Sequence, residues 1–258
     1  MFQREADFPH GESEVEIING TKYMNVMKYL NDVRQWDTFL GFQHPDYDHA
    51  MLFTRYDLYY QDPKNNGIRG QSWGKGVCLS GVKTSVVERG DYFITVYAAA
   101  HELGHNLGAV HDGTEDATGC RSEDLFLMSG TPLEFHPWRP YTRNPWLFST
   151  CSVKAFKKTL PDRECVHSKS LVYNQNEWTN FTAQQPGEEY SINEQCEFVM
   201  GYKSTYCGGV AADICRFMQC TDPKTGQCAD KYFSAARGTE CRSNMWCIEG
   251  RCVPKRYK

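Results

Sequence analysis

The sequence predicts a mixed α/β domain followed by a small disulfide-rich domain. Strand-like and helix-like patterns alternate along the first two thirds of the 258 residues, which is typical of helices packed on a mixed sheet. Eight of the twelve cysteines lie after residue 195, where the chain has too few apolar residues for an ordinary core. The length leaves room for one sizeable domain and one small one.

The first predicted elements are a strand, a turn and a helix. Val15–Ile18 alternates briefly and stops at Asn19-Gly20, so we expect a short strand that ends in a turn. Between Lys22 and Leu40 the apolar residues recur at helical spacing. We therefore expect one helix over residues 22–40, which Gly41 would end.

Further strands are expected before the second helix. Asp48–Thr54 is a short apolar run of the kind found in buried strands. Gly67–Gly76 is rich in glycine and contains one serine, which indicates a loop or an edge strand, and Val82–Val87 predicts another strand. His44 and His49 lie near strand ends without a partner at ligand spacing, so we interpret both as structural.

The second helix, expected over residues 97–107, presents two histidines at one point. At about 100° per residue, His101 and His105 lie within about 40° of each other and one turn apart. The apolar positions gather on the opposite side and are expected to pack inward: Val96, Ala100, Leu103 and Leu107.

A third histidine follows directly after this helix. Gly108 can end the helix with a sharp turn, so His111 can reach the same point, while Glu102 projects beside it. Three imidazoles next to a carboxylate are suited to a zinc site with one open coordination position. These residues at these offsets arise by chance in on the order of one chain in ten thousand to one in a hundred thousand, which disfavours a helix that carries histidines for other reasons.

Residues 101–112 carry the pattern His-Glu-x-x-His-x-x-Gly-x-x-His-Asp. This pattern resembles that of the metzincin zinc proteases, and the Asp after the third His resembles the adamalysin (reprolysin) branch. The resemblance implies an α/β (α+β) metzincin catalytic domain, whose mixed sheet has an antiparallel edge strand. Here Ser72–Cys78 resembles that edge strand, and Asp48–Thr54 resembles the central strand.

A methionine turn beneath the metal is the second family feature. Leu127-Met128-Ser129 resembles this turn, which makes Met128 a packing residue below the zinc. The resemblance also implies that residues 131–148, His136 among them, form the wall of a substrate pocket, and that residues 152–160 form the last helix of the domain. It further implies two disulfides, between Cys78 and Cys165 and between Cys120 and Cys151.

The resemblance implies a zinc metalloendopeptidase that cleaves protein substrates, with extracellular matrix or plasma-type proteins as the expected class. One catalytic Zn²⁺ would be held by His101, His105 and His111, and Glu102 would act as general base on the attacking water. Family calcium ligands come partly from a segment before the present residue 1. We expect that this N-terminal part of the catalytic domain is missing, which leaves calcium binding open.

The last part of the chain resembles a second known module. Residues 238–253 contain the pattern Gly-Thr-Glu-Cys-x5-Cys-x2-Gly-x-Cys-Val, which resembles the disintegrin-like cysteine-rich module of the ADAMTS proteases. Arthropod salivary and venom metalloproteases have a similar layout. We expect a catalytic domain over residues 1–166, a polar linker over 167–190 and the cysteine-rich domain over 191–258.

Composition and net charge bear on the partners and the location of the protein. The net charge of −4 is small, so nothing indicates a nucleic-acid partner, and no apolar run is long enough for a membrane span. Each set of cysteines is even, which fits disulfides in an oxidising compartment, and paired Cys-x-x-Cys units of a cytosolic zinc ribbon are lacking. We expect a secreted, extracellular protein, although residues 1–7 do not resemble a signal peptide.

Two other functions compete with the protease. A non-catalytic cell-surface module could bind integrins or matrix proteins through Arg89-Gly90-Asp91 and the cysteine-rich region, but such a module has no physical need for Glu102. A structural zinc protein is disfavoured because three ligands leave the metal site open.

Overall fold

The computed structural model describes residues 15–40, 47–64, 67–90, 92–131, 143–167, 184–208 and 213–255. These residues divide into two compact units. The first unit comprises the described residues up to 90, together with 94–131 and 148–167. The second comprises 92–93, 143–147 and the described residues from 184 onward.

Strands and helices alternate in the first unit and near its boundaries. Its helices and strands, in chain order, are β1 (Val15–Ile18), β2 (Thr21–Asn25), α1 (Val26–Leu40), β3 (Ala50–Thr54), β4 (Asp57–Tyr59), β5 (Gly70–Ser72), β6 (Thr84–Glu88), α2 (Tyr92–Leu107) and α3 (Thr150–Thr159). The second unit contains α5 (Pro186–Glu189), α6 (Ile192–Met200), α7 (Ile214–Phe217), β7 (Met218–Thr221), β8 (Cys228–Phe233), β9 (Glu240–Arg242), β10 (Met245–Ile248) and β11 (Arg251–Pro254).

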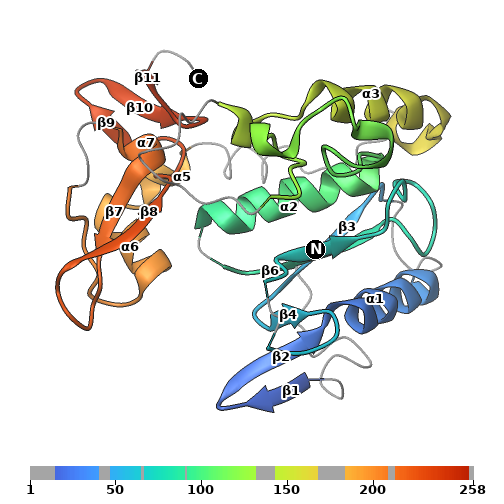
Figure 1. Ribbon diagram of the computed structural model, residues 1–258, viewed down its shortest axis with the longest axis horizontal. Helices are drawn as coiled ribbons and strands as arrows, with labels where there is room; N and C mark the ends of the chain where they lie inside the picture. Colours follow the sequence, from blue (N-terminus) through green and yellow to red (C-terminus); the bar gives the residue numbers. More distant parts are fainter. Residues whose placement is uncertain are drawn as a thin grey trace. The chain divides into compact units, whose positions relative to one another are not determined.

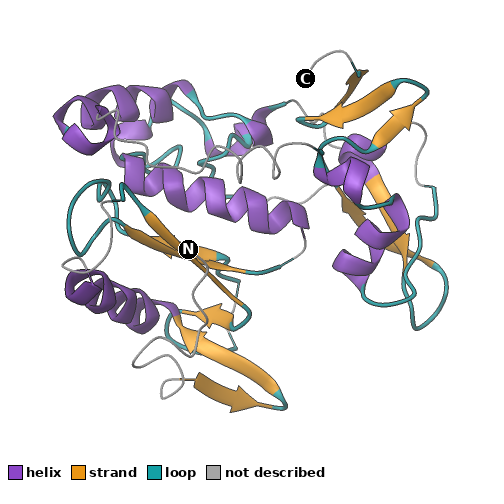
Figure 2. Cartoon of the chain, turned by 180° about the vertical axis from the view of Figure 1, so that it is seen from behind, coloured by secondary structure: helices purple, strands orange, loops and turns teal. Residues whose placement is uncertain are grey.

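Two three-stranded sheets form the first unit (Figure 2). In the sheet β1-β2-β4, β1 and β2 are antiparallel and β4 runs parallel to β2. In the sheet β3-β6-β5, β3 runs parallel to β6, and β5 pairs antiparallel with the other side of β6. The predicted mixed α/β architecture with an antiparallel edge strand is therefore confirmed.

The sheet β3-β6-β5 lies between helices α1 and α2 in both views of the chain, and α3 lies beyond α2 (Figures 1 and 2). All five residues of β6 are buried, as expected for a strand covered on both faces. Val86 of β6 joins a core with α1 and the neighbouring strands. The buried members of that core are Met24, Val26, Tyr29, Leu30, Val33, Tyr56, Leu58 and Val86.

The helix expected over residues 22–40 begins only at Val26, and the prediction is wrong for its first four residues. They belong to β2, because Asn19-Gly20 forms a tight turn that returns the chain along β1. Both turn residues have positive φ, 51° and 82°, which is the geometry of a two-residue hairpin turn. Pairing with β1 on one side and β4 on the other outweighs the helical spacing of the apolar residues.

Two strand assignments also need correction. Asp48–Thr54 contains β3, as expected, but β3 lies at an edge of its described sheet, and the central strand is β6. The antiparallel edge strand is Gly70–Ser72, whereas residues 73–78 continue as turns towards Cys78. The strand predicted over Val82–Val87 and the last helix predicted over residues 152–160 are confirmed, within two residues, as β6 and α3.

Disulfides replace much of the apolar core in the second unit. All twelve cysteines of the chain are paired, and the two sets predicted from the sequence pair within themselves. The expected Cys78–Cys165 and Cys120–Cys151 bonds are both present. In the second unit the bonds are Cys196–Cys220, Cys207–Cys228, Cys215–Cys247 and Cys241–Cys252.

A backbone hydrogen bond, an ion pair and a ring contact also hold parts of the second unit together. The Gly187 N–H donates to the carbonyl of Arg237 at 2.8 Å, so α5 is held against the chain before β9. Arg143 forms an ion pair with Glu249 in the turn between β10 and β11, and the Trp146 ring lies against Gly250 of the same turn. None of the described helices is both long and apolar enough to cross a membrane.

Candidate metal and catalytic site

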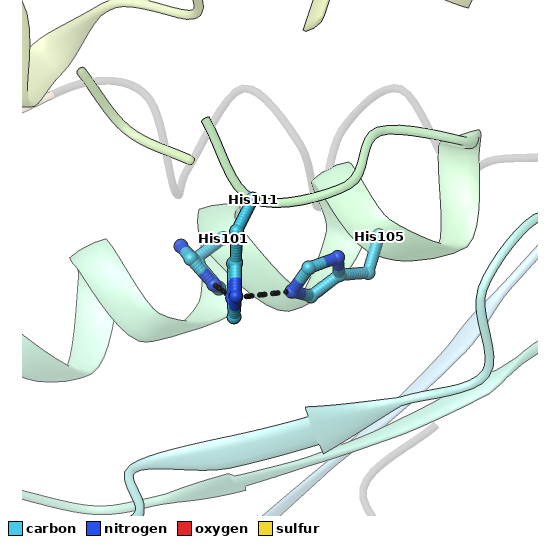
Figure 3. A group of neighbouring side chains, drawn as sticks. All are labelled: His101, His105 and His111. Carbon is cyan, nitrogen blue, oxygen red and sulfur yellow. Dashed lines mark hydrogen bonds between the residues drawn. The ribbon is translucent and has the colours of Figure 1, made fainter. Parts of the chain in front are cut away.

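Helix α2 and the turn after it bring the three predicted histidines together. His101 and His105 lie one turn apart on α2. Gly108 follows with φ +119°, a backbone conformation that residues with a side chain rarely adopt, and it ends the helix as predicted. The returning chain carries His111, and all three rings point to one place (Figure 3).

The ring nitrogens lie at distances that suit a shared metal ion. Nε2 of His111 lies 3.1 Å from Nε2 of His101 and 3.1 Å from Nε2 of His105. One ligand atom from each ring falls within 4.8 Å of the others. Two nitrogens bound tetrahedrally to zinc at about 2.0–2.1 Å would be about 3.3 Å apart.

The opposite ring nitrogens are hydrogen-bonded to the backbone. Nδ1 of His101 lies 2.7 Å from the carbonyl oxygen of Leu127, and Nδ1 of His105 lies 2.9 Å from that of Ala109. These carbonyls accept hydrogen bonds from the Nδ1–H groups, so the neutral rings of His101 and His105 present lone pairs at Nε2. A proton on Nε2 of His111 could satisfy only one of its two short contacts well, whereas a cation satisfies all three nitrogens. The donor set fits zinc.

Burial keeps these imidazoles neutral, as metal ligation requires. Desolvation, with help from the neighbouring His105 charge, lowers the pKa of His101 to about 3. The pKa values of His105 and His111 are also lowered, again mainly by burial. The three rings therefore do not need to lose a proton when a cation binds near neutral pH.

Glu102 lies beside the histidines and is almost fully buried, with 6% of its surface exposed. Its Oε2 atom has no hydrogen-bond partner among the described residues. Burial raises the pKa of this carboxyl to about 8, since a charge without a partner is costly in an apolar setting. A cation among the imidazoles would favour the carboxylate form, which is the form that can accept a proton.

Met128 supports the helix from the side of the turn that carries Leu127. Its side chain is completely buried. The sulfur lies so close to Gly104 of α2 that a Cβ atom there would be 2.5 Å from it. Met128 therefore packs against the helix between the two histidines.

Asp112 holds in place the segment after α2 that carries His111. Its N–H donates to the carbonyl of Met128 at 2.9 Å, and its carboxylate accepts a 2.7 Å hydrogen bond from the Ser149 hydroxyl. Ser149 is also the N-cap of α3, since its Oγ accepts from the N–H of Ser152. The third histidine is thus tied both to the methionine turn and to the start of α3.

Asn106 is a buried polar residue of the site that the sequence reasoning missed. Its Nδ2 donates to the carbonyls of Trp73 at 2.8 Å and Val82 at 2.9 Å, and its Oδ1 lies 2.9 Å from Nδ1 of His49. The other nitrogen of His49 bonds to the Ser85 hydroxyl at 2.9 Å. His49 is therefore structural, as interpreted, and Asn106 joins α2 to the chain just before β3, just after β5 and just before β6.

The apolar stripe predicted on α2 is only partly correct. Val96 is 51% exposed, so its expected inward packing is wrong. Ala98, Glu102 and Asn106 form the deeply buried line at four-residue spacing instead. This line is buried because α2 covers the sheet, and its polar member Asn106 finds a polar partner there in His49.

Some predicted features fall outside the described residues. They include residues 132–142 of the expected pocket wall, with His136, as well as His44 and Asp91. Arg89 and Gly90, the described part of the candidate integrin-binding tripeptide, are exposed.

A hollow of about 360 Å³ beside the histidines is lined by Gly74, Lys75, His105, Gly108, Ala109, Val110, His111 and Thr114.

Comparisons with known proteins agree with this geometry. Residues 6–131 match metallopeptidase family M12, and residues 186–253 match the ADAMTS cysteine-rich domain 2. The chain is 31% identical over 231 residues to mouse (Mus musculus) "A disintegrin and metalloproteinase with thrombospondin motifs 18", which covers 87% of this chain and 18% of that protein. It is 32% identical over 226 residues to "A disintegrin and metalloproteinase with thrombospondin motifs 7" of Rattus norvegicus, and the match covers 84% of this chain and 13% of that protein.

An insect relative shows the same pattern. The chain is 28% identical over 228 residues to "A disintegrin and metalloproteinase with thrombospondin motifs like" of Bombyx mori, covering 81% of this chain and 31% of that protein. The chain thus spans less than a third of the length of these curated relatives. Taken together, the two matched regions and the relatives show that the chain belongs to the reprolysin-type metallopeptidases of family M12 and carries an ADAMTS cysteine-rich domain.

Proposed function

We propose that this chain is a secreted zinc-dependent endopeptidase that cleaves extracellular protein substrates, such as matrix or plasma-type proteins. One observation carries this proposal: three Nε2 atoms converge, with separations of 3.1 Å from His111, beside a buried carboxyl that lacks a hydrogen-bond partner in the described structure. Membership of family M12 supports the reaction class. The six disulfides support an extracellular setting.

His101, His105 and His111 would hold the zinc ion, and Glu102 would move the proton. When bound, zinc supplies Lewis acidity and lowers the pKa of water to near 7. The Glu102 carboxylate accepts the proton of the attacking water and then donates it to the leaving amine. Met128 keeps the helix in place from below, and the carbonyls of Leu127 and Ala109 hold two of the rings in orientation.

The free edge of β5 would align the substrate. The carbonyl of Arg69 accepts from the N–H of Glu88, so residue 69 faces β6. Hydrogen-bonding direction alternates along an antiparallel pair, and the backbone groups of Gly70 and Ser72 therefore face away from β6. An extended peptide can add to these groups as a further strand, which would place its scissile bond near Glu102.

We also propose that the catalytic domain spans residues 1–166, the linker 167–190 and the cysteine-rich domain 191–258. The cysteine-rich domain would bind protein substrates or matrix proteins. A purely adhesive role for the chain has no comparable support, because it would leave the histidine cluster and the buried Glu102 without a purpose.

The decisive test compares the unmodified chain with Glu102→Ala. We expect the unmodified chain to bind one zinc ion and to cleave members of a peptide library, with cleavage lost on adding a chelator and restored by zinc. Glu102→Ala should bind zinc equally well and lose at least about 10³-fold in kcat, since the proton acceptor is gone. Unchanged turnover by this variant, or cleavage that resists chelation, would contradict the proposal.

A further inference from the structure

The edge strand β5 approaches the candidate general base more closely than a side chain would allow. Gly70, the first residue of β5, is paired with Val87 of β6. A Cβ atom at Gly70 would lie 2.6 Å from Cγ and 2.9 Å from Oε1 of Glu102. Both distances are shorter than real Cβ contacts, so a side chain at position 70 and the present Glu102 conformation exclude each other.

The backbone cannot easily relieve this crowding. The same Cβ atom would lie 3.0 Å from the carbonyl oxygen of Val86, which belongs to the central strand of the sheet. All five residues of β6 are buried, so that strand is held on both faces. Position 70 therefore lies between the side chain of Glu102 on one side and a fixed strand on the other.

Glu102 would therefore be the group that moves. The closest contact is with Cγ, near the root of the side chain, so a small rotation at the carboxyl end does not remove it. A different side-chain rotamer, or a shift of α2, would be required, and either one changes where the carboxyl lies relative to His101 and His105. A displacement of about 1 Å can cost on the order of 100-fold in rate.

We propose that Gly70 is a positioning residue, whose missing side chain leaves the space that Glu102 occupies beside the metal ligands. This inference rests on the proposed function, in which Glu102 is the general base. Glycine serves two needs at this position: it leaves room for Glu102 towards α2, and its backbone groups stay available at the open edge of β5. At other edge-strand positions an alanine is preferred over glycine, because it is less costly to order.

The experiment compares Gly70→Ala with Gly67→Ala in the zinc-loaded chain. A Cβ atom at Gly67 would meet nothing within 4 Å, and Gly67 lies only three residues before Gly70. We expect Gly70→Ala to lose about 100-fold in kcat with KM changed by less than about threefold and with one zinc still bound. Gly67→Ala should keep the kcat of the unmodified chain.

A stability cycle tests the same contact without using activity. Gly70→Ala should lower the Tm of the unmodified chain by roughly 3–10 °C through overpacking. In the Glu102→Ala background the Cγ and carboxyl atoms are gone, so the same substitution should leave the Tm within about 2 °C or raise it. Equal Tm losses in both backgrounds would place the crowding at Val86 and overturn the inference, as would a kcat for Gly70→Ala equal to that of Gly67→Ala.

The two proposals fail in different ways. If the unmodified chain shows no zinc-dependent cleavage, the proposed function is refuted, and the positioning role falls with it whatever the Tm cycle shows. If the unmodified chain cleaves peptides and Gly70→Ala cleaves them equally fast, only the positioning role is refuted.

Discussion

Replacing Asn106 with alanine tests how helix α2 is attached to the sheet. The Asn106 side chain is completely buried, and the substitution removes the hydrogen bond that it accepts and the two hydrogen bonds that it donates. It leaves the carbonyl of Val82 and Nδ1 of His49 without this partner, and it leaves the carbonyl of Trp73 with only the 3.3 Å hydrogen bond from the Ser72 hydroxyl. A buried polar group without a partner costs about 1–3 kcal/mol, and partial relief by a water molecule keeps the sum near the lower end. We therefore expect a loss of about 4 kcal/mol in the free energy of unfolding.

The assay is thermal unfolding of the zinc-loaded chain with its disulfides intact. For a domain of 150–250 residues, about 4 kcal/mol corresponds to a fall in Tm of about 8–16 °C. Asn31→Ala is the matched control, because Asn31 lies on α1 and is exposed. That change should alter the stability by less than about 0.5 kcal/mol. If Asn106→Ala costs less than about 1 kcal/mol, Asn106 does not join the helix to the sheet in the way described.

Two further predictions concern neighbouring groups. Gly104→Ala should lower the free energy of unfolding by about 1–3 kcal/mol, because its Cβ atom would lie 2.5 Å from the Met128 sulfur, and this crowding outweighs the helix preference of alanine. Adding the second substitution Met128→Ala should restore part of this loss. A Tm for Gly104→Ala above that of the unmodified chain would contradict the packing described. Burial lowers the pKa of His49, so its contribution to stability is complete above the unfolded pKa of about 6.5 and is lost as pH falls through the lower folded value. The Tm difference between the unmodified chain and His49→Gln should therefore shrink below about pH 6.5, and a constant difference from pH 5 to 8 would refute this role.

The histidine cluster could be predicted from sequence because it is a local feature. The helical period alone places His101 and His105 on one face, and Gly108 supplies the turn that brings His111 back. The strand β6 could also be predicted, since Val82–Val87 is rich in β-branched residues. Such features depend on neighbours within about ten residues along the chain.

The features that were missed depend on distant partners. Residues 22–25 form β2 because β1 and β4 lie on either side, and β4 comes more than thirty residues later. Val96 is exposed because the buried line of α2 is set by the sheet that it covers. The burial of Asn106 also needs Trp73, Val82 and His49, none of which is near it in sequence. The sequence contained one general indication of the role of Gly70, since a glycine inside a strand often marks a place where another group approaches closely.

The Cys78–Cys165 bond has a consequence for the proposed protease activity. It closes a loop of 87 residues, and His101, Glu102, His105, His111 and Met128 all fall inside it. A single nick within that loop, by the protein itself or by another enzyme, would leave both pieces covalently joined. The closure also restricts the unfolded chain, which is worth about 4–5 kcal/mol for a loop of this size. A reducing environment would remove both protections at once, so exposure to thiols should make the protein easier to inactivate even while His101, His105 and His111 remain unchanged.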